Sequence, residues 1–274
     1  MKTLTSQIEE IWKNYNNLPA KSEKFKHAVK IVRVVIGIVN SGEQRVSARI
    51  KQGKWKTYHW VKKAIFLSFL LNKSNIIASS YIHYYDKIPP KFNLSWDEDE
   101  FEKENLRIVP TAYIREGSYI GKNTIIMPCF INIGAYIDNN TMIDAQVTIG
   151  SCAQIGKDCH ISSGVTIGGV LEPVQSNPVI IEDNCFIGAG CNITEGVIIE
   201  EGSIIAMGVN IGASTKIINQ KTGEVLYGRV PAYSVVIPGS IKSNGSNMHY
   251  ACAVIIKKTD SNTRKKVDIN ELLR

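Results

Sequence analysis

The 274-residue chain has no hydrophobic run approaching the roughly 18 apolar residues that a membrane-spanning helix needs. Its first residues also lack the apolar core of a secretory signal peptide, since Glu9 and Glu10 follow the start at once. These absences argue against a helical membrane protein and predict a cytoplasmic protein that has no membrane partner.

The six cysteines form no Cys-x-x-Cys pair, so the sequence offers no recognisable zinc or dithiol motif. They lie in apolar or small-residue stretches, which predicts buried reduced thiols. The net charge of +7 is spread unevenly, with segment values of +8 for residues 1–100, −6 for 101–219 and +5 for 220–274. This excess is not gathered with aromatic residues on one element, as a nucleic-acid surface would require. It indicates a solvated surface or attraction of small anionic ligands.

A six-residue repeat fills the middle of the chain. Bulky residues recur at Tyr113, Tyr119, Ile125, Ile131, Ile137, Ile143, Ile149, Ile155, Ile161 and Ile167, and again at Ile181, Ile187, Ile193, Ile199, Ile205, Ile211 and Ile217. Neither a helix nor a hairpin sheet has an unbroken period of six. One short strand and one tight corner do fit this step, and three steps close a triangular coil.

The fold class is therefore a β-solenoid, a left-handed parallel β-helix of hexapeptide repeats. Residues 18 apart, such as Ile131 and Ile149, are expected to stack, with Gly134 and Asn140 among the corner residues. We expect an N-terminal mixed α/β domain over 1–100, the β-helix over 101–219 and a small C-terminal β extension over 220–274. The 14-residue gap after Ile167 exceeds two steps by two, which predicts a bulging loop at 169–178.

The flanking segments lack the six-residue period. Apolar spacing predicts a helix capped by Ser6, a second helix ending near Ser41 and a third over 60–71. Alternation predicts a hairpin over 46–57 with its turn at Gln52–Gly53, and a strand over 251–256.

Three classes of function use such a solenoid. A metal hydratase needs several converging imidazoles, but 101–219 contains the single histidine His160, and no metal site is predicted. Ranks of Thr-x-Thr typical of an ice-binding face are absent, and a non-catalytic structural solenoid has no need of the flanking domains. CoA-dependent acyl transfer is the class that we favour.

Several motifs resemble the tetrahydrodipicolinate N-succinyltransferase family over essentially the whole chain. They are residues 60–64, 106–110, 141–144, 150–156, 168–173, 181–189, 227–232 and 269–274. The resemblance implies transfer of succinyl from succinyl-CoA to the amine of ring-opened tetrahydrodipicolinate, in lysine and diaminopimelate biosynthesis. It also implies a homotrimer with active sites between neighbouring solenoids, and no permanently bound cofactor.

By the same resemblance, Arg107 corresponds to the substrate-binding arginine and Asp144 to the substrate-binding and catalytic carboxylate. Such chemistry needs a base for the amine and a cation for a dicarboxylate. The family pattern after Gly188–Ala189 is Arg-Ser-Glu, but this chain has an asparagine, Asn192, in place of that second catalytic glutamate. Asn192 can bind substrate but cannot accept a proton, and Gln146 stands near the position of a family tryptophan.

Two interpretations stay open: a succinyltransferase that works with Asp144 alone, or a diverged relative that acylates another amino acid or uses acetyl-CoA, as in tabtoxin-type antibiotic pathways. For the CoA arm we expect small residues along a solenoid groove, and for its phosphates three basic side chains. The candidates are Gly188, Ala189, Met207, Gly208, Ala213, Ser214, Arg229, Lys257 and Lys258.

Overall fold

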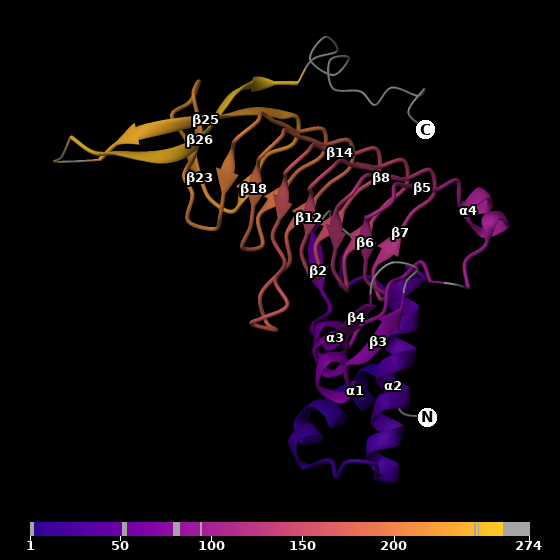
Figure 1. Ribbon diagram of the computed structural model, residues 1–274. Coiled ribbons are helices and arrows are strands. Elements are labelled where there is room, and N and C mark those ends of the chain that lie inside the picture. The colour runs from indigo at the N-terminus through magenta and orange to yellow at the C-terminus, as the bar shows by residue number, and fades with distance from the viewer. Residues whose placement is uncertain are drawn as a thin grey trace.

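A triangular left-handed β-helix forms the centre of the molecule, as the computed structural model shows (Figure 1). The structure describes residues 3–50, 54–78, 83–93, 95–243, 245 and 247–259. The predicted turn at Gln52–Gly53 and the motif at 269–274 lie outside the described residues.

The solenoid has three faces, each a ladder of two-residue parallel strands. Face 1 contains β5 (Arg107–Ile108), β8 (Ile125–Ile126), β11 (Met142–Ile143), β14 (His160–Ile161), β17 (Phe186–Ile187) and β20 (Ile204–Ile205). Face 2 contains β6 (Tyr113–Ile114), β9 (Phe130–Ile131), β12 (Thr148–Ile149), β15 (Thr166–Ile167), β18 (Asn192–Ile193) and β21 (Asn210–Ile211). Face 3 contains β7 (Tyr119–Ile120), β10 (Tyr136–Ile137), β13 (Gln154–Ile155), β16 (Ile180–Ile181), β19 (Ile198–Ile199) and β24 (Arg229–Val230).

The second residue of each strand points into the core, and these side chains form a continuous column. Ile131, Ile149 and Ile167 are in register on face 2, which confirms the predicted 18-residue stacking. The corners use left-handed backbone at residues such as Gly134 and Asn140, with φ of 80° and 60°. Burial of this column is the main favourable contribution to the fold.

The predicted column is wrong at its first three positions. The inward residues there are Ile114, Ile120 and Ile126, each one position after the predicted one. The step from Ile126 to Ile131 is shortened by one residue, so the phase changes at that corner. Tyr113 and Tyr119 point outward instead, and their rings stack on the aromatic rings of the next rung at 6.1 and 4.5 Å.

The predicted loop at 169–178 leaves the solenoid after face 2. Ile167 pairs with Ile193, 26 positions later, whereas a regular coil has 18 residues. The insertion therefore adds eight residues to a single step, and the predicted excess of two residues over two steps is wrong. Lys62, which is fully buried, anchors this loop. Its Nζ donates to the carbonyl oxygens of Ser176 and Pro173, at 2.7 and 3.3 Å.

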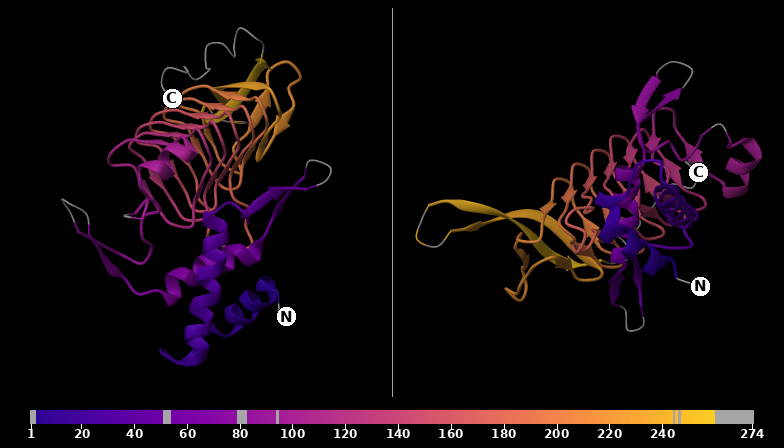
Figure 2. Two further views of the ribbon diagram at one scale, coloured as in Figure 1. Left: turned by 90° about the vertical axis from the view of Figure 1, so that its right-hand side faces the viewer. Right: turned by 90° about the horizontal axis from the view of Figure 1, so that it is seen from below.

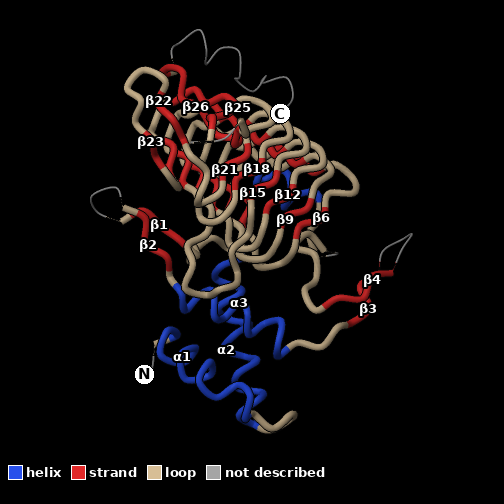
Figure 3. The backbone as a smooth tube through the Cα atoms, turned by 90° about the vertical axis from the view of Figure 1, so that its left-hand side faces the viewer, coloured by secondary structure: helices blue, strands red, loops and turns tan. Residues whose placement is uncertain are grey.

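The N-terminal part combines helices with two hairpins (Figures 2 and 3). Its elements are α1 (Leu4–Asn14), η1 (Tyr15–Asn17), α2 (Glu23–Asn40), β1 (Ser47–Arg49), β2 (Trp55–Thr57), α3 (His59–Leu71), β3 (Asn75–Ala78), β4 (His83–Asp86) and α4 (Glu98–Glu104). The three predicted helices and the first hairpin are present. Thr3, not Ser6, caps α1, because its hydroxyl accepts the backbone N–H of Ser6.

Residues near the β1–β2 hairpin pack on face 3. The guanidinium of Arg45 lies 3.7 Å from the ring centre of Tyr136, and its Nε donates to Gln154 Oε1 at 3.1 Å. Trp55 Nε1 donates to the buried Glu182 at 2.7 Å. Face 3 is therefore partly covered by the chain's own N-terminal part.

The chain beyond the last rungs forms a β extension that continues face 1 (Figure 1). Its strands are β22 (Ile217–Asn219), β23 (Val225–Leu226), β25 (Ser234–Lys242) and β26 (His249–Lys258). β25 pairs with β20 in parallel and with β26 in an antiparallel hairpin that projects from the solenoid. The predicted strand over 251–256 is the central part of β26.

Burial of Lys91 is expected to make the stability of the protein depend on pH. Burial lowers the pKa of Lys91 to about 8, while Glu116 opposes that shift, and Nζ donates to two oxygens of Asn40 at 3.0 Å. Between pH 8 and 10.5 the unfolded state holds a proton that the folded state has lost, so stability rises with pH. Relative to Lys91→Met, the wild-type free energy of unfolding is expected to rise by about 2 to 3 kcal/mol across this range. Urea unfolding at several pH values measures it, and parallel pH curves for the two proteins would contradict it.

Candidate functional site

Asp144 stands at the corner between faces 1 and 2, directly after β11. Its backbone N–H donates to Ile161 O, and the equivalent bonds of Ser162 and Gly188 continue the ladder up the same corner. We call this corner the Asp144 edge, which comprises residues 144–146, 162–164, 188–190 and 206–208. Successive rungs are about 4.8 Å apart, which puts Gly188 about 10 Å from Asp144 along the edge.

The carboxylate of Asp144 is accessible and held by local contacts. Its Oδ1 accepts the N–H of Ala145 at 2.7 Å, and Oδ2 lies 3.9 Å from His160 Nε2. The side chain is 29% exposed, so a ligand at the solenoid surface can reach it. An ionised carboxylate here is placed to accept a proton.

Four predicted CoA-arm residues lie together on the Asp144 edge. Gly188 and Ala189 occupy one rung, and Met207 and Gly208 occupy the next. A Cβ at Gly188 would approach the backbone N of Met207 to 2.5 Å, so only glycine lets the two rungs come this close. Met207 is 72% exposed and leaves an apolar surface at the edge.

Asn192 and the pair Ala213–Ser214 lie beyond this edge. Asn192 points outward on face 2, and its Nδ2 donates to Asn210 Oδ1 at 2.6 Å. Ala213 and Ser214 follow β21 at the opposite border of face 2, where Ala213 N–H donates to Glu195 Oε2 at 2.8 Å. Glu195 therefore serves another corner and does not replace a carboxylate at position 192.

The predicted cationic residues are dispersed. Arg107 is exposed on face 1, two strands from β11. Arg229 lies on face 3, where it forms an ion pair with Glu200. Lys257 and Lys258 end β26, five strands from β11 in the ladder of face 1, or about 24 Å by strand spacing. A ligand that contacts both Asp144 and this lysine pair must be long and extended.

His160 is a residue of the site that the sequence analysis did not select. It faces outward on β14, directly beside Met142, and burial lowers its pKa while Asp144 acts in the opposite direction. The usable signal is its distance from Met142, since 18 residues is one full coil of the repeat. Sequence reasoning used this histidine only to argue against a metal site.

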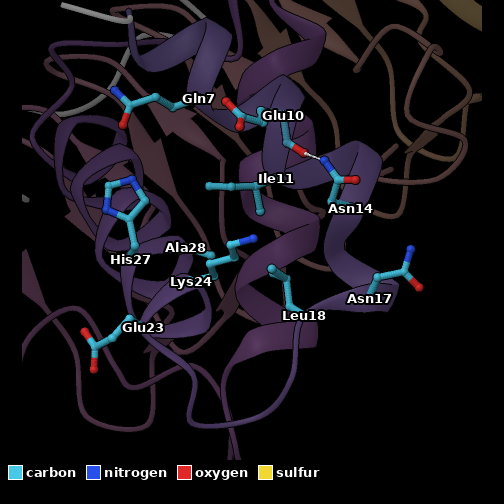
Figure 4. A pocket seen from close by; sticks show the side chains of 10 residues that line it. All are labelled: Gln7, Glu10, Ile11, Asn14, Asn17, Leu18, Glu23, Lys24, His27 and Ala28. Carbon is cyan, nitrogen blue, oxygen red and sulfur yellow. Dashed lines mark hydrogen bonds between the residues drawn. The ribbon is translucent and has the colours of Figure 1, made fainter.

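A separate cavity of about 670 Å³ opens between α1 and α2 (Figure 4). Glu10, Asn14, Lys24 and His27 are among its lining residues, and Asn14 Nδ2 donates to the carbonyl of Glu10 at 2.9 Å. The cavity shares no lining residue with the Asp144 edge.

The described part of the chain holds neither a metal-ligand cluster nor a membrane-spanning helix. There, no three His, Cys, Asp or Glu side chains converge in a way that could hold a metal ion. Within the same ranges, none of the helices combines the length and apolarity needed to cross a bilayer. All six cysteines are buried free thiols, as the sequence predicts.

Three segments of the chain match models of known transferase families. Residues 3–71 match the model for the N-terminal region of tetrahydrodipicolinate N-succinyltransferase. Residues 178–213 match the hexapeptide repeat of succinyl-transferase, and residues 134–169 match the bacterial transferase hexapeptide.

Full-length relatives carry the same name, 2,3,4,5-tetrahydropyridine-2,6-dicarboxylate N-succinyltransferase. The relative from the Wolbachia of Brugia malayi is 52% identical over 274 residues, covering 100% of this chain and 99% of its own. The one from Caulobacter vibrioides is 48% identical and covers 100% of both chains. The one from Sodalis glossinidius is 54% identical over 89% of this chain and 88% of its own.

Proposed function

Because the chain belongs to the tetrahydrodipicolinate N-succinyltransferase family, we propose that it transfers succinyl from succinyl-CoA to the amine of ring-opened tetrahydrodipicolinate. The observation that carries this proposal is the full-length similarity to relatives of that name. The accessible carboxylate of Asp144 on a solenoid edge supplies the chemistry that such a transfer needs.

Asp144 acts as the general base. The neutral amine attacks the thioester carbonyl, a C–N bond forms, and the tetrahedral oxyanion collapses with cleavage of the C–S bond. Asp144 accepts the proton that the amine loses, and the departing CoA thiolate is protonated to the thiol. The products are the N-succinyl amide and CoA. Arg107, through a bidentate ion pair, and Asn192 bind the dicarboxylate substrate in this scheme. Because β5 and β18 lie about four rungs apart in one chain, roughly 19 Å, the two side chains act from different copies across a shared seam.

The Asp144 edge is the track for the pantetheine arm. Gly188, Ala189 and Gly208 present backbone close to the surface, where an extended amide-bearing arm can contact it. Ala213 and Ser214 line the opposite border of face 2. Arg229, Lys257 and Lys258 are proposed to hold the phosphates, and their separation from Asp144 suits a cofactor as long as CoA.

The assembly that we propose is a homotrimer with each site at a seam between neighbouring solenoids. The N-terminal part packs on face 3, which leaves faces 1 and 2, with the Asp144 edge between them, for this seam. The buried free thiols suit the reducing cytoplasm, where we place the enzyme. Acyl-CoA is a co-substrate in this proposal, with no permanently bound cofactor and no metal.

Titration calorimetry and a thiol-release assay test the reaction. The purified protein is expected to bind succinyl-CoA and to release CoA only when the amino dicarboxylate is present. Acetyl-CoA serves as the comparison acyl donor. Absence of binding heat with both thioesters would refute the acyltransferase assignment.

Met207 provides a test of the pantetheine track. Met207→Glu places a carboxylate on an exposed side chain at the edge, where it repels the anionic cofactor and removes apolar contact. The KM for succinyl-CoA is expected to rise about tenfold, equivalent to about 1.4 kcal/mol, with thermal stability unchanged. An unchanged KM would place the arm elsewhere. Met248→Glu, on another exposed methionine, is the matched control.

Asn192 separates the drifted succinyltransferase from a diverged relative. In Asn192→Glu, Asn210 can turn its amide so that N–H donates to the new carboxylate, and the fold is expected to tolerate the change. Activity with tetrahydrodipicolinate is expected to stay equal or increase, measured as kcat/KM. A fall in kcat/KM would favour a different amino substrate for this chain.

A further inference from the structure

His160 and Asp144 face each other on adjacent rungs, and the scheme above gives the imidazole no role. Asp144 Oδ1 is occupied by the N–H of Ala145 at 2.7 Å. The other oxygen, Oδ2, lies 3.9 Å from His160 Nε2. Oδ2 is thus the oxygen that both the imidazole and an incoming amine can reach.

The imidazole is held in an apolar setting that leaves this nitrogen without a partner. The ring of His160 packs edge-on against Phe186, with centres 5.3 Å apart and planes at 86°. Nε2 is buried and has no hydrogen-bond partner among the residues that the structure describes. A buried unpaired polar atom costs free energy, so an arrangement that pairs it with Asp144 is favoured. A separation of 3.9 Å is too long for a hydrogen bond, but a small side-chain rotation closes it.

We propose that His160 is a positioning residue for Asp144. The Nε2–H of His160 donates to Oδ2 of Asp144 and orients the carboxylate toward the substrate amine. This inference rests on the proposed function. The imidazole keeps its own proton throughout. The amine proton goes to the free lone pair of Asp144 and leaves with the CoA thiol or solvent, so His160 undergoes no net change.

The charge state of His160 agrees with this role. Burial lowers its pKa below the ordinary value, and the opposing effect of Asp144 is smaller. The residues in register on either side, Met142 and Phe186, carry no charge, and Asp144 is the charged group among the described residues that acts on the ring. The lowered pKa favours the uncharged imidazole. A neutral donor orients the carboxylate without the strong ion pair that would weaken it as a base.

Kinetics of paired variants test the proposal. His160→Phe keeps an aromatic ring that can contact Phe186 but removes the donor, and it is expected to lower kcat at least about tenfold with little change in the KM for succinyl-CoA. His160→Gln retains an N–H near the same position and is expected to recover most of the loss. The double variant Asp144→Asn/His160→Phe should be no slower than Asp144→Asn alone. Equal losses in both single His160 variants, or multiplying losses in the double variant, would overturn the proposal.

An NMR titration of the imidazole tests the pairing without relying on activity. The His160 ring signal is the one that disappears in His160→Gln. In the control variant His249→Phe, which changes an exposed histidine, that signal is expected to remain. The pKa of His160 is expected to fall in Asp144→Asn, because the carboxylate raises it in the wild type. An unchanged pKa would overturn the proposal. If that shift occurs in a protein that transfers no succinyl group, the proposed reaction fails and only the electrostatic contact between Asp144 and His160 is established.

Discussion

Asp144→Asn is expected to lower kcat for succinyl transfer by at least about 10²-fold, the lower end of the loss for a general base. The amide is nearly isosteric and can keep the contact of Oδ1 with the N–H of Ala145, so the corner should remain intact. What it loses is the ability to accept the amine proton. Initial rates of CoA release at saturating concentrations of both substrates measure the effect.

Asp158→Asn is the matched control for this experiment. Asp158 is another corner aspartate, more exposed than Asp144 and with left-handed backbone, and its Oδ1 accepts from Asn140 Nδ2 at 3.0 Å. It follows face 3 rather than face 1, away from the Asp144 edge. Its kcat is expected to stay within about twofold of wild type, as for a surface substitution of small effect on stability. A wild-type rate in Asp144→Asn would mean that another group is the base.

The six-residue period predicts most of the fold, because each step of six must contain one strand and one corner. Ile149 and Ile167 can stack only if one strand and one corner recur at that interval. Where two neighbouring residues are both large, the period does not show which of them points into the core. Tyr119 and Ile120 fit the outward and the inward position equally well on size, and only the coil itself shows which one is inside.

The length of the loop insertion has the same origin. The spacing between Ile167 and Ile181 allows either one step plus eight residues or two steps plus two. The choice depends on which face receives β16, and β16 pairs with β13 on face 3. Lys62, which lies outside the solenoid, anchors the loop by hydrogen bonds to residues more than 100 positions away in the sequence. No local pattern contains that information.

The candidate site could be predicted in part. Resemblance selects Asp144, and the repeat places Gly188 and Met207 on the same edge because their backbone positions recur with the coil. His160 is missed because an outward position on a strand reads as surface until the neighbouring rung is known. The dispersal of Arg229 and Lys258 is likewise invisible in sequence, since it depends on which face each strand joins.

Ile149→Ala is expected to lower the free energy of unfolding by about 4 kcal/mol, in the upper half of the range for truncating a buried isoleucine. Ile149 has no exposed surface and is held in register by Ile131 below and Ile167 above. The backbone ladders on all three faces prevent the rungs from closing the cavity, so little of the loss is recovered by relaxation.

The adjacent residue provides the control for that substitution. Thr148 is exposed on the outer side of the same strand, and Thr148→Ala is expected to cost less than about 1 kcal/mol. Denaturant unfolding at one fixed protein concentration compares the two variants, because assembly would make stability depend on concentration. Equal losses at positions 148 and 149 would contradict a solenoid core of inward isoleucines. A large difference between neighbouring residues is what alternation across a single strand demands.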